Sequence, residues 1–211
     1  MVKNVIFDYM GVLADVDYKK LLSKISLNEK FKAIRIITAL KLHPTFKYSF
    51  DQYQLGALNK NDLYEIAHKI YPKSAEIIPT LLNLLPNCLK ENEAVVSLAK
   101  KLHNDGYKII LISNSIPEMQ EKIQNSSLVE FFDGFVMSHL VGMMKPDKNI
   151  FDFACKTYEI DPKETIFIDD TPENLIGAKN AKLETMHCKK PNILATELTD
   201  FIYNRNQPES N

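Results

Sequence analysis

The chain contains, at residues 165–174, the stretch Thr165-Ile166-Phe167-Ile168-Asp169-Asp170-Thr171-Pro172-Glu173-Asn174, which decides the fold class. Its first four residues form a short apolar run, which is typical of a buried strand. Thr171 and Pro172 then predict a helix, because proline is well accommodated in a first helical turn. Two carboxylates therefore follow a buried strand. Such a pair repels unless a cation neutralises it, and carboxylate oxygens suit Mg²⁺.

Other apolar runs resemble strands, and helical patterns separate them. The runs cover residues 3–7, 107–112, 134–137 and, more weakly, 184–188. Helical patterns cover 91–102 and 149–158, and Ser115-Ile116-Pro117-Glu118 has the spacing of a capping box that would open another helix. Strands that alternate with helices at this spacing predict an α/β fold with a Rossmann-like, doubly wound parallel sheet.

Residues 17–89 differ from the rest, because they show helical patterns and almost no strand signal. We expect helices at residues 18–27, 29–42, 62–71 and 75–85. The sequence therefore predicts a core domain made of residues 1–16 and 90–211 and an inserted α-helical cap domain at 17–89. The polar tail at 204–211 is expected to fray.

The bulk composition argues against several classes of partner. The 211 residues are 45% hydrophobic and 25% charged, with a formal net charge of -1, so nothing favours nucleic acid or an anionic membrane surface. No apolar stretch approaches the roughly 18–20 residues of a membrane span, and the N-terminus lacks the pattern of a signal peptide. Three widely spaced cysteines fit reduced thiols. We expect a cytoplasmic protein whose partner is a small molecule; the oligomeric state stays open.

Three further segments carry side chains that suit phosphate chemistry. Asp8 follows the first predicted strand, Ser113 ends the second, and Lys145-Pro146 precedes a helix. Open α/β folds bind ligands at the carboxyl edge of the sheet, where such residues meet. A hydroxyl beside a helix start can seat a phosphate, although simple N-capping by Ser113 and Ser115 is the competing interpretation. A lysine there would offset the repulsion between a carboxylate nucleophile and a phosphate.

In this order and at these separations, the four segments resemble the four signature motifs of the haloacid dehalogenase (HAD) superfamily. The resemblance covers roughly residues 1–16 and 90–190. Within the superfamily, the chain resembles the phosphatase branch, which carries a helical cap between the first two motifs. It implies a Mg²⁺-dependent phosphohydrolase acting on a small phosphorylated metabolite, with a sugar phosphate as one candidate. The cap itself shows no sequence match that would identify the substrate.

The resemblance also implies roles for the residues that handle the phosphoryl group. Asp8 would attack phosphorus and form an aspartyl-phosphate, which water then hydrolyses. Ser113 and Asn114 would bind the phosphoryl group. Lys145 would bind it too, and would offset charge between the nucleophile and the phosphate.

The metal site is implied by the same resemblance. Asp8, the main-chain carbonyl of Met10 and Asp170 would hold Mg²⁺ directly. Asp169 would support the metal from behind these ligands or through water. Asn174 would orient the acidic pair or the lysine.

Met10 departs from the pattern of the family. In most HAD phosphatases this position, two after the nucleophile, is a second Asp that protonates the leaving group and then activates water, steps typically worth about 10²–10⁴-fold each. Methionine can do neither, so the rate and the proton path are in question. A subfamily resembling glucose-1-phosphate phosphatases also has a non-acidic residue there, followed by an Asp-x-Asp like Asp15-Val16-Asp17. Asp15 is then either a substitute proton donor or a solvated loop carboxylate.

Two other functions compete with a phosphatase. A 2-haloacid dehalogenase also lacks the second Asp, but it needs no Mg²⁺, and the pair Asp169-Asp170 argues against it. A catalytically weakened phosphometabolite-binding or regulatory protein is the other alternative. His139, in the loop after the third predicted strand, could reach the site, although a lone loop histidine is usually polar surface.

Overall fold

The structure is a computed structural model, and it describes residues 1–205. Five parallel strands form one sheet in the order β5-β4-β1-β6-β7. They are β1 (Asn4–Phe7), β4 (Lys108–Ser113), β5 (Gly134–Met137), β6 (Thr165–Asp169) and β7 (Glu184–His187). The predicted α/β class and parallel sheet are confirmed, and each expected strand lies within one residue of its predicted bounds. The carboxyl ends of β1, β4 and β6 therefore share one edge.

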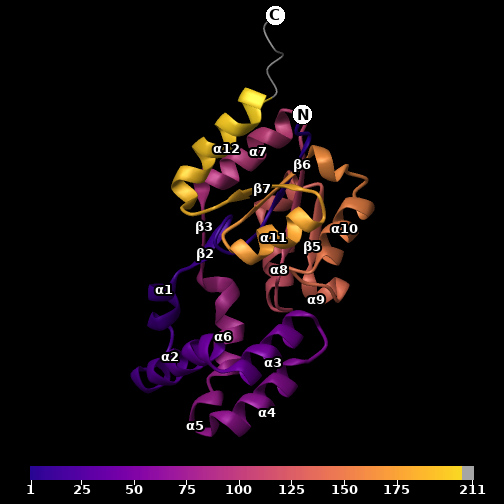
Figure 1. Cartoon of the computed structure of the whole chain (residues 1–211). Helices are drawn as coiled ribbons and strands as arrows, with labels where there is room; N and C mark the ends of the chain where they lie inside the picture. Colours follow the sequence, from indigo (N-terminus) through magenta and orange to yellow (C-terminus); the bar gives the residue numbers. More distant parts are fainter. Residues whose placement is uncertain (206–211) are drawn as a thin grey trace, which may run out of the picture.

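Helices cover both faces of this sheet (Figure 1). Side chains alternate between the faces along a strand, so Val5 and Phe7 pack on one side of β1 and Ile6 on the other. The first face is covered by α7 (Glu93–Asn104) and α12 (Pro191–Arg205), and the second by α10 (Lys148–Thr157) and α11 (Pro172–Asn180). Burial on both faces explains why the strands are continuous apolar runs in the sequence.

The segment between β1 and α7 is helical, and Figure 1 shows its helices gathered at one end of the molecule, away from the sheet. They are α1 (Tyr18–Ser23), α2 (Leu27–Leu42), α3 (Pro44–Gln54), α4 (Lys60–Ile70), α5 (Pro72–Ala75) and α6 (Ile78–Leu84). An antiparallel pair, β2 (Ala14–Val16) and β3 (Leu89–Glu91), leads the chain out and back. The predicted domain boundaries fall at the end of β2 and inside β3, and we keep the division into core and cap as a proposal.

Three helical predictions differ from the structure. Helix α3 was not expected, because a proline such as Pro44 often ends a helix. Pro44 lies in the first turn of α3 instead, and His43 caps the helix by accepting from the Phe46 N–H. The helix expected at 75–85 is shorter in the structure: α6 begins at Ile78 and ends at Leu84, and Ala75 ends the preceding α5. The helix expected to open at Ser115 begins later, as α8 (Met119–Gln124), so the predicted capping box is wrong.

The remaining elements are short, and the last helix of the described residues is α12. They are η1 (Leu85–Cys88), η2 (Ser127–Glu130), α9 (Ser138–Val141) and η3 (Pro162–Glu164). Helix α12 was not expected and runs to Arg205, so the first two positions of the tail predicted to fray are helical. The rest of that tail, 206–211, lies outside the described residues.

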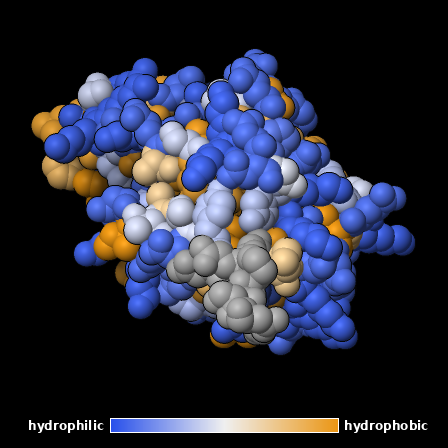
Figure 2. Space-filling view, turned by 90° about the horizontal axis from the view of Figure 1, so that it is seen from above, coloured by the Kyte–Doolittle hydropathy of each residue, from blue (hydrophilic) through white to orange (hydrophobic). Residues whose placement is uncertain are grey.

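Seen from the end that carries α12, the described surface is mainly hydrophilic, and its apolar side chains form small separate patches (Figure 2). Within residues 1–205, no helix is both long enough and apolar enough to cross a bilayer. Cys88, Cys155 and Cys188 are free and buried.

Candidate active site

A cleft of about 630 Å³ opens at the carboxyl edge of the sheet. All four segments that the sequence singled out reach it, because Asp8, Ser113, Lys145 and Asp170 line its walls. The parallel sheet causes this convergence, since β1, β4 and β6 end side by side. Its volume falls in the range of roughly 300–1,000 Å³ that is usual for small-molecule sites.

Lys145 is the buried cation at the base of the cleft, with a side chain that is 1% exposed. Its Nζ lies 2.7 Å from Asp8 Oδ1 and 2.7 Å from Asp169 Oδ2. Burial alone would lower the pKa of Lys145, but the two carboxylates outweigh it and hold that pKa above its usual value. Lys145 therefore stays charged and fixes the direction of both carboxylates.

Asp8 presents its two oxygens differently. Oδ1 accepts from the Tyr9 N–H at 2.7 Å and from Lys145. Oδ2 has no hydrogen-bond partner within residues 1–205, and it is not among the fully shielded atoms. Burial raises the pKa of Asp8 to about 7; Lys145 opposes this rise and the charge of Asp169 adds to it. A carboxylate held by one oxygen, with the other free beside a cleft, can act as a nucleophile.

Asp169 is fully buried and engaged through both oxygens. It accepts from the Thr171 N–H at 2.8 Å and from Asn174 Nδ2 at 3.1 and 3.0 Å, in addition to Lys145. These bonds leave little capacity for a further ligand. The geometry favours a positioning role for Asp169 behind the reacting groups.

Asp170 is exposed at the cleft, and it completes a group of carboxylates that could hold a cation. Ligand atoms of Asp8, Asp169 and Asp170 all lie within 4.8 Å of one another. Burial and the charge of Asp169 raise the pKa of Asp170, because both disfavour a further negative charge beside Asp169. Gly11 makes room for it: at φ +82° it has no side chain, and a Cβ there would lie 2.5 Å from Asp170 Cγ. Hard oxygens in this spacing fit Mg²⁺.

Met10 lies in the cleft wall, as its place after Asp8 requires. Its side chain is half-buried and carries no group that can give or take a proton. Only its main-chain carbonyl could contribute to a metal site. The predicted metal set of Asp8, Met10, Asp170 and Asp169 is thus brought to one place.

Ser113 is the last residue of β4 and Asn114 follows it, but their side chains make different contacts. Ser113 is 2% exposed and lines the cleft, and within the described chain its hydroxyl forms no hydrogen bond, so it is available to a ligand. The Asn114 side chain instead bonds the main chain of Lys145, donating to its carbonyl at 2.8 Å and accepting from its N–H at 2.8 Å. The side chain of Asn114 therefore positions the lysine loop, and its predicted part in phosphoryl binding stays a prediction.

The Ser115 helix start does not provide the phosphate seat that the sequence suggested. Its N–H donates to Ser138 Oγ at 3.0 Å, and its hydroxyl lies 2.9 Å from His139 Nδ1. Glu118, the other residue of the predicted capping box, accepts a hydrogen bond from Tyr53 and forms an ion pair with Lys60, both in the helical segment. His139 is not among the residues that line the cleft.

Close helix packing also holds the loop that carries Lys145. Gly177 on α11 faces Pro146, and a Cβ at that glycine would lie 2.0 Å from the Pro146 carbonyl oxygen. Only a residue without a side chain allows this approach. The loop is therefore clamped between Asn114 on one side and α11 on the other.

The end of α3 touches the core beside the cleft, which the sequence did not reveal. Gln54 Nε2 donates to the Asn114 carbonyl at 3.0 Å, and Ser138 Oγ donates to the Gln54 carbonyl at 2.6 Å. Tyr53 OH and Lys60 Nζ bond Glu118, at 2.6 and 2.7 Å. No local pattern marks these residues, because each contact joins positions far apart in the chain.

The chain is similar in sequence to a hydrolase family and to phosphatases. A family model described as haloacid dehalogenase-like hydrolase matches residues 2–182. The chain is 26% identical to the D-ribitol-5-phosphate phosphatase of Bacteroides thetaiotaomicron, over 96% of this chain and 99% of the relative. It is 26% identical to the sesquiterpene phosphatase astK of Aspergillus oryzae, over 73% and 79%.

A solved structure shares the fold. A HAD family enzyme from Bacteroides thetaiotaomicron, solved with magnesium and inorganic phosphate, superposes with a TM-score of 0.68. It is 23% identical and covers 89% of this chain and 94% of its own.

The crowded carboxylates predict that Asp170→Asn stabilises the protein when metal is removed by a chelator. The substitution relieves repulsion at an exposed position, an effect of about 0.5–1 kcal/mol. For a chain of this size, 1 kcal/mol shifts Tm by about 2–4 °C. Mg²⁺ should raise the Tm of the wild type and leave that of Asp170→Asn unchanged, because a ligand stabilises only the state that binds it.

Two variants calibrate this experiment. Asp200→Asn, an exposed substitution on α12, should change neither Tm nor its response to Mg²⁺. Lys145→Met should have the opposite sign, since removing one partner of a buried ion pair typically destabilises by about 3–5 kcal/mol. An Asp170→Asn protein that is less stable in chelator, or that Mg²⁺ stabilises like the wild type, would refute the proposed metal position.

Proposed function

Because the chain belongs to the haloacid dehalogenase-like hydrolases, we propose that it is a Mg²⁺-dependent phosphohydrolase that works through an aspartyl-phosphate on Asp8. The observation that carries this proposal is the state of Asp8: Lys145 and the Tyr9 N–H hold Oδ1, and Oδ2 is left free at the cleft. The named relatives are phosphatases, which supports phosphate ester hydrolysis as the reaction class.

In the first step, Asp8 Oδ2 attacks phosphorus, and the bond between phosphorus and the ester oxygen breaks. A carboxylate and a phosphate dianion repel each other, so the step needs positive charge and hydrogen-bond donors. Lys145 supplies the charge from the base of the cleft, and the Ser113 hydroxyl can donate to a phosphoryl oxygen. Mg²⁺, held by Asp8, Asp170 and the Met10 carbonyl, would neutralise charge on the phosphoryl group.

In the second step, water attacks phosphorus, which releases inorganic phosphate and restores the Asp8 carboxylate. Across both steps the departing oxygen gains a proton and the attacking water loses one. Met10 can handle neither proton. Asp15 lies on β2 and is exposed, and it lines the same cleft as Asp8. We therefore propose Asp15 as the group that transfers these protons.

Which organic group the site accepts depends on the walls of the cleft, because the four motif segments would contact only the phosphate and the metal. The relatives named above act on a sesquiterpene phosphate and on D-ribitol 5-phosphate, which differ widely in polarity. We propose a small phosphorylated metabolite chosen by the helical cap; the sugar phosphate suggested by the sequence around Met10 was one candidate of this class. A cytoplasmic location and the absence of nucleic-acid and membrane partners stay predictions.

Asp8→Asn is expected to abolish Mg²⁺-dependent release of phosphate from para-nitrophenyl phosphate, because an amide cannot form the acyl-phosphate. The loss should be at least about 10³-fold, the scale seen when a nucleophile is removed. Release should also stop in the wild type when a chelator removes the metal. The measurement is phosphate release with and without Mg²⁺, with the Tm of each variant as a folding control.

Other outcomes would favour other functions. Equal phosphate release by wild type and Asp8→Asn would exclude the covalent mechanism. Metal-independent chloride release from 2-chloropropionate would favour a dehalogenase. Tight phosphate binding by a wild type that releases nothing would favour a phosphometabolite-binding protein.

Met10→Asp is expected to raise the turnover of alkyl phosphates, because it restores an acid beside the nucleophile. General acid–base catalysis typically contributes about 10²–10⁴-fold, so a tenfold or greater rise in kcat is a modest expectation. Para-nitrophenyl phosphate should gain less in the first step, since its leaving group departs without a proton. The measurement is kcat for both ester classes.

Met10→Asn provides a control of similar shape that carries no acid, and it should leave turnover near the wild-type value. Asp15→Asn tests the substitute donor and should lower alkyl phosphate turnover in the wild-type background more than in Met10→Asp. Unchanged turnover in Met10→Asp would show that proton transfer does not limit this enzyme.

A further inference from the structure

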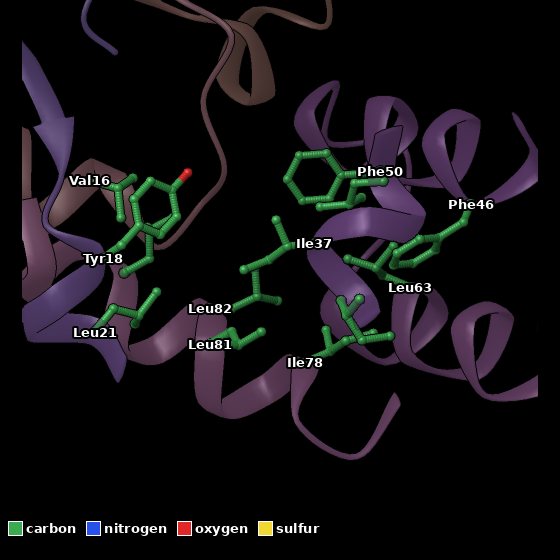
Figure 3. Close-up of a pocket in the computed structure, with 13 residues that line it drawn as sticks. Val16, Tyr18, Leu21, Ile37, Phe46, Phe50, Leu63, Ile78, Leu81 and Leu82 are labelled. Atoms are coloured by element: carbon green, nitrogen blue, oxygen red, sulfur yellow. The ribbon is translucent and has the colours of Figure 1, made fainter. Parts of the chain in front are cut away.

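A second pocket, of about 220 Å³, lies among the helices of the cap (Figure 3). The described residues that line it are all aliphatic or aromatic, and Tyr18 contributes the only hydroxyl among them. An apolar cavity of roughly 150 Å³ lined by Leu, Ile and Phe can bind benzene. This pocket therefore has the size and the lining for a hydrocarbon group.

The side chains around the pocket come from several elements and face one another. Figure 3 shows Tyr18 and Leu21 on one side and Phe50 on the other, with Ile37 and Leu82 between them. These residues belong to α1, α2, α3 and α6, and Leu63 of α4 also lines the pocket, so the pocket lies where several cap helices meet. Phe46 and Phe50 of α3 and Ile78, Leu81 and Leu82 of α6 all line this space.

Several of the lining residues are incompletely buried, although they lie inside the cap. Ile37, Leu40, Phe50 and Leu81 are half-buried and line the pocket. Keeping such hydrocarbon surface in contact with water is unfavourable. An apolar ligand that filled the pocket would remove this surface from water.

The pocket adjoins the catalytic cleft. Val16, which ends β2, and Tyr18, which begins α1, line both the pocket and the cleft that holds Asp8. A molecule with its phosphate at Asp8 would therefore have to pass Val16 and Tyr18, the wall that the two spaces share, to reach the cap. The two spaces together have one polar end, with the catalytic charges, and one apolar end.

We propose that this pocket binds the hydrocarbon part of the substrate, so that the enzyme acts on phosphate monoesters of apolar alcohols. The proposal rests on the phosphohydrolase function proposed above and adds the class of substrate. A polyol chain would lose its hydrogen bonds to water in the pocket and find almost no replacement there. Sugar phosphates are therefore disfavoured relative to esters that carry an alkyl or isoprenoid chain.

The test uses para-alkylphenyl phosphates, from methyl to octyl, because their leaving phenols are equally acidic and only the chain differs. We expect kcat/KM to rise about two- to fourfold for each added methylene until the pocket is filled, which corresponds to at most about 0.8 kcal/mol per buried CH₂. A para-(3-hydroxypropyl)phenyl ester should be hydrolysed less well than the butyl ester of equal length.

Leu81→Trp places a large side chain in the pocket, at a half-buried position that is more tolerant than the core. It should abolish the dependence on chain length, so that phenyl phosphate and octylphenyl phosphate are hydrolysed with similar kcat/KM. Leu42→Trp is the matched control, since Leu42 is 77% exposed in the same segment and does not line the pocket. It should keep the full dependence on chain length.

A binding measurement separates this proposal from the catalytic one. Octanol should raise the Tm of wild type and Asp8→Asn alike, and it should not raise that of Leu81→Trp. A flat chain-length series with normal phenyl phosphate hydrolysis, or equal effects of octanol on wild type and Leu81→Trp, would overturn the apolar substrate alone. Failure to hydrolyse any ester, phenyl phosphate included, would instead overturn the phosphohydrolase function and the substrate assignment with it.

Discussion

The site depends on one buried cation that holds two carboxylates. Lys145 bonds Asp8 and Asp169 at 2.7 Å each, and this fixes the nucleophile and closes the base of the cleft. A third carboxylate, Asp170, shares the site, so the negative charges outnumber the positive one. Such an arrangement is stable when a divalent cation joins it, and it can then accept a phosphate dianion. The contacts of Asn114 and Gly177 serve to hold Lys145 where this balance requires it.

The core of the fold was predictable, because its strands are buried on both faces and read as continuous apolar runs. The helical segment was harder. Pro44 signals a break and a first helical turn equally well, and only the packed structure decides between them. The strands β2 and β3 have three residues each, and their pairing joins Asp15 to Lys90 across the whole inserted segment. No local pattern contains that information.

The candidate site shows the same division. Asp8, Ser113, Lys145 and Asp170 could be predicted together, because parallel strands bring their carboxyl ends to one edge. The residues that support them could not. Asn114 has the sequence neighbours of a substrate ligand, yet its amide bonds the lysine loop. The capping-box spacing at 115–118 failed because tertiary contacts occupy both of its side chains. The apolar pocket arises only where several cap helices meet.

Met10 separates the two halves of the proposed reaction, because Asp8 can attack phosphorus but no acid at position 10 can activate the water that follows. The most direct test is rapid-quench mass spectrometry during turnover of para-nitrophenyl phosphate with Mg²⁺. The account predicts a covalent phosphoryl group on Asp8 that accumulates in the wild type and is much less populated in Met10→Asp, because hydrolysis is then faster. Turnover with no phosphoryl group on Asp8 at any time, in either protein, would contradict it.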